Sequence, residues 1–193
     1  MVQQEKVSED KMIVLASASP RRRELLKYIT ADFVTVPSKV EEIVPLGLTP
    51  PQSVEYLAKI KAEDISKQYS KDIVIGADTI VVAEGKVLNK PQSYEECVEM
   101  ITLLSGKTHN VYTGVAIVKD GKTHTFFEQT EVTFYKLSNE EIAAYADTKE
   151  PYDKAGGYGI QGGGAMLVHS INGDYYNVIG LPVAKLSRVL KAI

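Results

Sequence analysis

A short polar loop, Ser17–Arg23 (SASPRRR), directly follows an apolar run over residues 12–16. Its serines and its proline are typical of a helix start, where backbone N–H groups are free to bind an anion. Arginine binds phosphate through paired hydrogen bonds, so three arginines at this point favour a phosphate site. The alternative is an ordinary surface helix, although positive charges in a first turn oppose the helix dipole by about 0.3–1 kcal/mol each. The loop is therefore predicted to hold phosphate groups.

Asp78 is a second candidate because it interrupts the apolar run Ile73–Ala83. Such a run is typical of a strand that is buried on both faces of a sheet. An ionised carboxylate buried there without a partner would be strongly unfavourable, so Asp78 must be paired, bound to a metal or placed at a cleft. An aspartate that bonds to the backbone at a strand bend is the alternative.

Lys61 is a third candidate because of its place on a predicted helix. It lies on the same stripe of that helix as the apolar residues Val54, Ala58 and Ile65. Its ammonium group therefore points inward or along a cleft, unless the side chain reaches out to solvent from the edge of the core.

Glu42 and Lys90 give weaker signals. Paired acids such as Glu41-Glu42, and a lysine before a proline such as Lys90-Pro91, are common on protein surfaces. Glu42 gains interest beside Asp78, because carboxylates bind the hard divalent cation that usually accompanies a triphosphate.

A glycine-rich segment, Glu150–Ala165, contains six glycines. Glycine allows the backbone to approach a ligand closely, so the segment is predicted to line a binding site, with a flexible surface loop as the alternative. The amide of Gln161 can both donate and accept hydrogen bonds, which suits recognition of a nucleobase edge.

Other patterns carry no chemistry. Ser105–Thr108 (SGKT) looks like the end of a P-loop, but that motif needs a glycine where Ile101 stands, and the tetrapeptide follows a predicted helix instead of starting one. The three histidines show no metalloprotease or catalytic-triad spacing, so they are interpreted as structural or exposed. The single cysteine, Cys97, excludes an intramolecular disulfide and is typical of a reducing compartment.

The overall composition is that of an ordinary globular protein. Of 193 residues, 44% are hydrophobic and 24% charged, and the net charge of −3 argues against nucleic-acid and anionic-membrane partners. No segment is long and apolar enough to span a membrane, and a cytoplasmic location is expected. Residues 1–11 are interpreted as a flexible arm, and 12–193 as a single catalytic domain with two lobes around a cleft.

Strand and helix patterns alternate, but an Asp120-Gly121 turn predicts a β-hairpin that adds antiparallel strands. The expected fold class is therefore α/β, with a mixed sheet and flanking helices rather than a purely parallel doubly wound sheet. Expected strands cover residues 12–16, 33–36, 73–83, 109–118, 123–135 and 165–171, and expected helices cover 20–29, 50–69, a segment that ends at Gly106, 138–146 and 181–192.

Several motifs follow one another in order along the chain: SASPRR at 17–22, EE at 41–42, Lys61, IGADTIV at 75–81, NKP at 89–91, SGKTHNVYTGV at 105–115 and EPYDKAGGYGIQG at 150–162. Together they resemble the Maf family of nucleoside triphosphate pyrophosphatases. The resemblance runs from Met12 to Ile193 and implies an elongated α/β fold with a central cleft, similar to that of the inosine triphosphate pyrophosphatases. It also implies a homodimer.

The resemblance also assigns roles to residues. Catalytic positions of the family match Glu42, Lys61, Asp78 and Lys90, with Asp78 as general base, and phosphate-binding positions match Ser17, Arg21 and Arg22. The branch that prefers dTTP and UTP carries arginine, threonine and glutamine where this chain has Arg21, Thr79 and Gln161. The expected substrates are therefore dTTP, UTP and modified pyrimidine nucleotides.

The expected reaction releases pyrophosphate after water attacks the α-phosphorus. Mg²⁺ or Mn²⁺ held by Glu42 and Asp78 is expected to assist, while Lys61 and Lys90 stabilise the growing negative charge. The alternative is a nucleotide-binding regulator of cell division and septum formation that acts without turnover. Pure binding needs positive charge and gains nothing from a base such as Asp78, so the residue set favours the enzyme.

Overall fold

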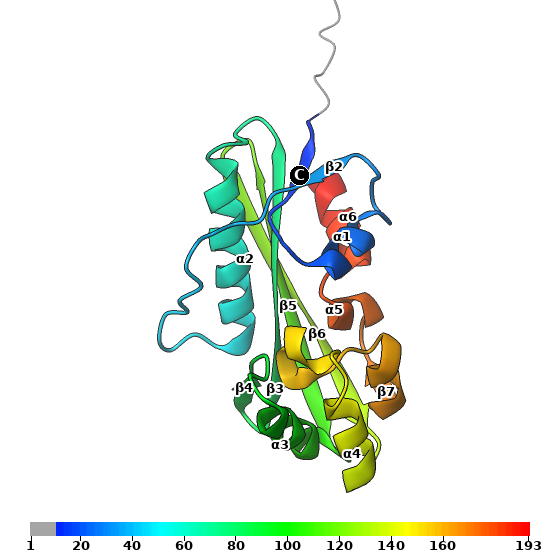
Figure 1. Cartoon of the computed structure of the whole chain (residues 1–193). Coiled ribbons are helices and arrows are strands. Elements are labelled where there is room, and N and C mark those ends of the chain that lie inside the picture. Colours follow the sequence, from blue (N-terminus) through cyan, green and yellow to red (C-terminus); the bar gives the residue numbers. More distant parts are fainter. Residues whose placement is uncertain (1–10) are drawn as a thin grey trace, which may run out of the picture.

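The computed structural model describes residues 11–193 and shows an elongated molecule built on one long sheet (Figure 1). The arm expected at residues 1–11 lies outside the described residues, apart from Lys11. Strands are β1 (Ile13–Leu15), β2 (Phe33–Thr35), β3 (Ile73–Ala83), β4 (Lys86–Leu88), β5 (Thr108–Lys119), β6 (Lys122–Phe134) and β7 (Val168–Asn172). Helices are α1 (Pro20–Leu26), α2 (Pro50–Ser66), α3 (Tyr94–Leu104), α4 (Asn139–Ala146), α5 (Tyr175–Ile179) and α6 (Val183–Ala192), with 3₁₀ turns η1 (Pro151–Asp153), η2 (Ala155–Gly157) and η3 (Gly162–Leu167).

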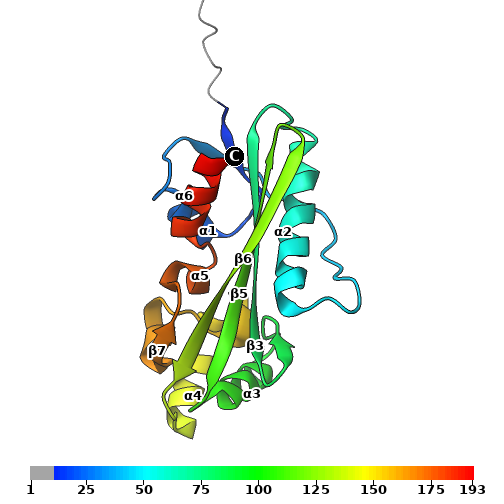
Figure 2. The ribbon, with the colours of Figure 1, turned by 180° about the vertical axis from the view of Figure 1, so that it is seen from behind.

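The sheet is mixed, as the sequence predicts. Its strand order is β2-β1-β3-β5-β6-β7, and β4 pairs with β3 outside this path. Strand β1 runs parallel to β2 and β3, whereas the β3–β5, β5–β6 and β6–β7 pairs are antiparallel. The β5–β6 hairpin extends along the molecule and turns at Asp120 and Gly121, both with positive φ (Figure 2).

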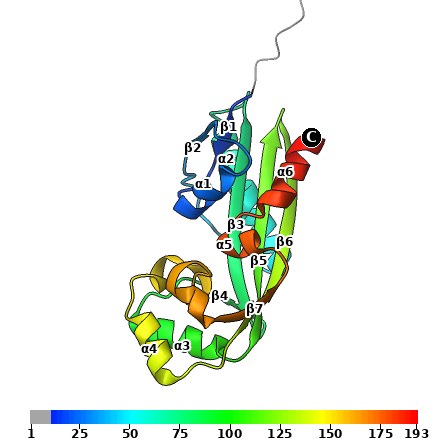
Figure 3. The same cartoon turned by 90° about the vertical axis from the view of Figure 1, so that its right-hand side faces the viewer.

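Alternate side chains of the central strands pack on opposite faces of the sheet. Val74 and Ala116 join a cluster with helix α2, whereas their neighbours Ile75 and Ile117 join one with α1 and α6. This two-residue period is the reason that β3 is apolar apart from Asp78 and Thr79, because both of its faces are covered by helices. Figure 3 shows α6 beside the long hairpin and α1 near β1.

Two glycines let α2 approach the sheet closely. A Cβ atom on Gly76 of β3 would lie 2.3 Å from the carbonyl oxygen of Ala58, and one on Gly114 of β5 would lie 2.3 Å from backbone atoms of Val54. Any larger residue would push the helix outward. The close contact brings the middle of α2, where Lys61 lies, against β3.

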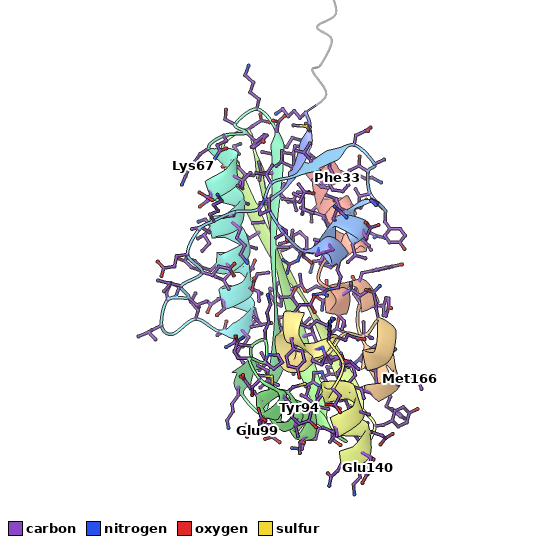
Figure 4. The ribbon with its side chains drawn as sticks, viewed as in Figure 1. Phe33, Lys67, Tyr94, Glu99, Glu140 and Met166 are labelled. Carbon is purple, nitrogen blue, oxygen red and sulfur yellow. The ribbon has the colours of Figure 1, made fainter. Side chains whose placement is uncertain are left out.

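Helices α3 and α4 cover the end of the sheet where β5 begins and β6 ends. The apolar face of α3, with Cys97, Ile101 and Leu104, packs into a cluster that includes Phe134 of β6. The opposite face of the helix is polar, and Glu99 points away from the protein (Figure 4).

Some boundaries differ from the prediction. The strand expected over 165–171 is partly wrong, because η3 continues to Leu167 and β7 begins at Val168. The glycines at the start of η3 include Gly162 with a φ of 70°, which favours a turn over an extended strand. The short elements β4 and α5 were not predicted. No helix within residues 11–193 combines the length and apolar character needed to cross a bilayer.

Candidate active site

A cleft of about 1200 Å³ lies where the β1–α1 loop, α2, β3 and the glycine-rich segment converge. Its lining draws on segments from both ends of the sheet (Figure 1). All nine residues singled out in the sequence line it: Ser17, Arg21, Arg22, Glu42, Lys61, Asp78, Thr79, Lys90 and Gln161.

The predicted phosphate loop starts helix α1. The Ser19 hydroxyl accepts a hydrogen bond from the backbone N–H of Arg22 at 3.4 Å, and Pro20 is the first helical residue. The serine cap and the proline thus act as their sequence predicts.

Three side-chain contacts hold the Arg22 guanidinium at the cleft. Its Nε donates to the carbonyl oxygen of Gly180 at 2.8 Å, its Nη2 to the hydroxyl of Thr79 at 3.0 Å, and its Nη1 to that of Ser17 at 3.4 Å. Burial lowers the pKa of Arg22, and the negative charge of Asp78 opposes that shift. Because arginine starts from so high a pKa, the side chain stays a cation.

Lys61 joins the two candidate carboxylates. Its Nζ lies 2.7 Å from Oδ1 of Asp78 and 2.8 Å from Oε2 of Glu42. The Lys61 and Asp78 side chains are 11% and 13% exposed, whereas Glu42 is 53% exposed. Asp78 therefore lies at the cleft with a charged partner, as its burial requires. It lies within the unbroken strand β3, opposite Gly114, so the alternative of a strand bend is wrong.

The same carboxylates have the chemistry of a divalent-cation site. Oxygen ligands suit Mg²⁺, which protein sites often hold through one or two carboxylates together with substrate phosphates. Glu42 and Asp78 supply such a pair at the cleft. Within residues 11–193 no group of three or more His, Cys, Asp or Glu residues is arranged to hold a metal.

Arg21 reaches across the cleft to the glycine-rich segment. Its Nη1 donates to Oδ2 of Asp153 at 2.9 Å and its Nη2 to the backbone oxygen of the same residue at 3.3 Å. The Nζ of Lys154 bonds to the other carboxylate oxygen at 2.6 Å. Asp153 and Lys154 also line the cleft, although the sequence did not single them out within their motif.

Glu150 anchors the glycine-rich segment through its carboxylate. Oε2 accepts from the N–H of Gly163 at 2.9 Å, and Oε1 accepts from that of Gly164 at 3.1 Å and from the Tyr145 hydroxyl at 3.2 Å. The N–H of Gly159 donates to that hydroxyl at 3.3 Å. The chain is thus fixed on both sides of Gln161, whose side chain is exposed at the cleft.

Lys90 lies on the same side of the cleft as this segment. It is exposed, and the side-chain amide of Gln92 donates to its backbone oxygen at 3.0 Å. The backbone oxygen of the preceding residue, Asn89, accepts from the N–H of Gly156 at 3.0 Å. These contacts fix the backbone around Lys90.

Three residues that lie behind Arg22 were not predicted from the sequence as part of the site. Thr113 and Asn177 are fully buried and hydrogen-bonded to each other, and Gly180 accepts from Arg22. The polar Thr113 within the buried strand β5 was the available signal, but threonine is a common strand residue.

The excluded patterns behave as predicted. The segment Ser105–Thr108 joins the end of α3 to β5 and starts no helix, so it is no P-loop. His109 is buried and structural, whereas His169 is exposed.

Comparison with known proteins gives consistent matches. A model of the family described as Maf-like protein matches residues 12–193. A Bacillus cereus protein named dTTP/UTP pyrophosphatase is 54% identical over 181 residues, which cover 94% of this chain and 95% of the relative. A Bacillus cytotoxicus protein of the same name is 52% identical over 181 residues, which again cover 94% of this chain and 95% of the relative. The structure of a HAM1 protein from Coxiella burnetii covers 95% of this chain and 100% of its own, with a TM-score of 0.54 and 16% identity, which supports the expected fold.

Proposed function

Because the chain belongs to the family of Maf-like proteins, we propose that it hydrolyses dTTP and UTP to nucleoside monophosphate and pyrophosphate. Relatives with more than half of their residues identical carry the name of that activity. The observation in the structure that best supports the proposal is the Glu42–Lys61–Asp78 cluster, which shares one cleft with Arg22.

In the proposed reaction, Asp78 takes a proton from the water that attacks the α-phosphorus. A new bond forms between the water oxygen and that phosphorus, and the bond from the α-phosphorus to the bridging oxygen breaks. Pyrophosphate leaves with the electron pair. Lys61 holds the Asp78 carboxylate in place and, with Lys90, stabilises the negative charge that develops on the phosphate.

The remaining cleft residues bind the substrate. Ser17, Arg21 and Arg22 hold the phosphate chain, whereas Thr79 and Gln161 contribute to the preference for pyrimidines. Glu42 and Asp78 would hold Mg²⁺ or Mn²⁺, which when bound neutralises charge on the phosphate oxygens. Lys61 bonds to one oxygen of each carboxylate, which leaves the second oxygen of each available.

The decisive experiment identifies the products and the bond that is cut. The protein is incubated with dTTP, UTP, CTP, ATP and 7-methyl-GTP in ¹⁸O-labelled water with Mg²⁺ or Mn²⁺. We expect pyrophosphate from dTTP and UTP, with the label in the monophosphate. Label in the pyrophosphate would place the attack at the β-phosphorus, and release of orthophosphate would contradict the proposed activity.

The regulatory alternative predicts a different outcome. A protein that acts by binding alone would restore a cell-division phenotype after Asp78→Asn, whereas the enzyme would not. The homodimer and the cytoplasmic location stay predictions, which light scattering and cell fractionation test. We also propose that residues 12–193 act as one catalytic domain.

A further inference from the structure

We propose that Thr113, a residue outside the cleft, positions Arg22 for phosphate binding by fixing the direction of the Thr79 hydroxyl. The inference rests on the proposed function and adds a positioning residue to it. It gives Thr79 a second role, as a hydrogen-bond acceptor that acts on the phosphates through Arg22.

The supporting observation is a closed ring of hydrogen bonds behind the phosphate loop. Arg22 donates to Gly180 and to Thr79, as described above. The Oγ1 atoms of Thr79 and Thr113 lie 2.9 Å apart, and Thr113 bonds to the backbone oxygen of Asn177 at 2.9 Å. The N–H of Gly180 donates to that same oxygen at 3.0 Å, which closes the ring.

The direction of each bond in this ring follows from the types of group. A backbone carbonyl can only accept, so Thr113 must give its single hydroxyl hydrogen to Asn177. Thr113 is then an acceptor toward Thr79, which must donate its own hydrogen. Thr79 has no second hydroxyl hydrogen, so its oxygen accepts the hydrogen bond from Arg22 through a lone pair.

The same count defines what Arg22 can offer a ligand. A guanidinium group carries five N–H donors. The bonds to Gly180, Thr79 and Ser17 use one each on Nε, Nη2 and Nη1. One N–H then remains on each of the two terminal nitrogens, and both are available to phosphate oxygens. The ring therefore turns the free end of Arg22 toward an anion.

Burial makes the arrangement rigid. Thr113 and Asn177 are both 0% exposed, so water cannot replace their bonds. If the Thr113 hydroxyl were removed, the Thr79 hydroxyl would be free to rotate and could point its hydrogen at Arg22. Asn177 would keep its bond from Gly180, so the change would disturb the direction of Thr79 more than the fold.

The test compares two fully buried threonines, of which only Thr113 belongs to the ring. Thr113→Val removes the hydroxyl in the ring. Thr130→Val removes the hydroxyl of an equally buried threonine, which bonds to the backbone oxygen of Asp174 and accepts from the Asn177 side chain but has no contact with Arg22. Both variants loosen α5, so Thr130→Val is the control for a merely structural effect, and melting temperatures compare their stabilities.

The readout is inhibition by inorganic pyrophosphate during hydrolysis of UTP. We expect Thr113→Val to raise the inhibition constant roughly fivefold to tenfold, as one lost hydrogen bond would, and to lower kcat/KM by a similar factor. Thr113→Ser should restore both values, and Thr130→Val should leave both near those of the wild type. The preference for UTP over CTP should not change in Thr113→Val.

A double-mutant cycle keeps the proposal testable if Thr113→Val folds poorly. Thr79→Val removes the acceptor at the cleft, and adding Thr113→Ala, which removes the Thr113 hydroxyl with a smaller side chain, should cause no further loss of pyrophosphate inhibition. Equal effects of Thr113→Val and Thr130→Val would overturn the proposal, as would a changed base preference with unchanged pyrophosphate inhibition. Failure of the proposed function would look different, because the wild type itself would then release no pyrophosphate.

Discussion

The two sides of the cleft are built in different ways. On one side, formed by the β1–α1 loop, α2 and β3, the buried side chains of Lys61 and Asp78 and the half-buried side chain of Arg22 face the cleft and are held by other side chains. On the other side, the cleft is lined by the backbone of the glycine-rich segment 150–164. The carboxylate of Glu150 fixes this backbone.

This difference assigns proton transfer and the binding of the nucleobase to different sides of the cleft. A buried side chain that is held by charged partners can have a fixed position and protonation state, as a proton-transfer step requires. A glycine-rich backbone allows close approach to a flat nucleobase but supplies no acid or base of its own. We therefore expect changes of the Lys61–Asp78 pair to affect kcat, and changes in the glycine-rich segment to affect KM and base preference.

The largest effect is expected for Asp78→Asn. Asparagine keeps the shape of the side chain but cannot accept the proton of the attacking water. Loss of a general base typically costs about 10²–10⁴-fold in rate, so we expect kcat with UTP to fall roughly a thousandfold while UTP still binds. Steady-state kinetics and calorimetric titration measure the two quantities.

Asp153→Asn is the control, because this aspartate lies on the other side of the cleft and contacts Arg21. It should change KM more than kcat. If Asp78→Asn turned over UTP at the wild-type rate, the assignment of chemistry to the β3 side would be wrong.

The next effect in size is expected for Arg22→Lys. A single ammonium group cannot reach Gly180 and Thr79 and also present two donors to phosphate. We expect kcat/KM for UTP to fall roughly 10–100-fold, which corresponds to about 1.4–2.8 kcal/mol of transition-state binding. Arg23→Lys is the matched control, because Arg23 is 57% exposed and contacts the surface residue Glu24. A comparable loss in Arg23→Lys would show that overall charge, and not the held fork of Arg22, binds the phosphates.

A smaller effect, on the binding of UTP rather than on its turnover, is expected for Glu150→Gln. A glutamine side chain has one carbonyl oxygen, so it cannot accept from the N–H groups of both Gly163 and Gly164 with separate oxygens as the carboxylate does. We expect KM for UTP to rise several-fold, in line with the loss of one or two hydrogen bonds, and kcat to stay within about twofold.

Glu99→Gln is the control for Glu150→Gln, because Glu99 is exposed on the outer face of α3 (Figure 4). Its kinetic constants should match those of the wild type. If Glu150→Gln lowered kcat as strongly as Asp78→Asn, the assignment of proton transfer and nucleobase binding to different sides of the cleft would fail.

The sequence was sufficient where local physics decides the outcome. The cap at Ser19 and the turn at Asp120 depend on neighbouring residues, and both form as predicted. Asp78 and Lys61 were found because each is a charged residue in an apolar pattern, and burial requires a charge to find a partner. The partner itself was not predictable from spacing.

The sequence was insufficient where contacts join distant segments. Thr113 and Asn177 meet across 64 positions of the chain, and threonine in a strand or asparagine before a turn is too common to stand out. Gly180 contributes a backbone oxygen, which no side-chain pattern reveals. The five-residue helix α5 that carries Asn177 is also too short to show a clear helical period.

The smallest effect on turnover is expected from His109, which supports the glycine-rich side from behind. Its Nε2 is hydrogen-bonded to the hydroxyl of Tyr158 at 2.7 Å, and Tyr158 lines the cleft. The ring packs edge-on against Phe134 and Tyr158. Burial lowers the pKa of His109 from 6.5 to about 4.

The pH dependence of stability follows from this shift. Between pH 6.5 and about 4 the unfolded chain binds a proton at His109 that the folded protein does not. Acidification through this window therefore favours unfolding, and the free energy of unfolding should fall by up to about 3 kcal/mol from this group. Urea unfolding at several pH values measures the slope. His109→Phe should flatten the slope and leave kcat at pH 7 within about twofold. An unchanged slope in His109→Phe would show that other groups govern acid unfolding.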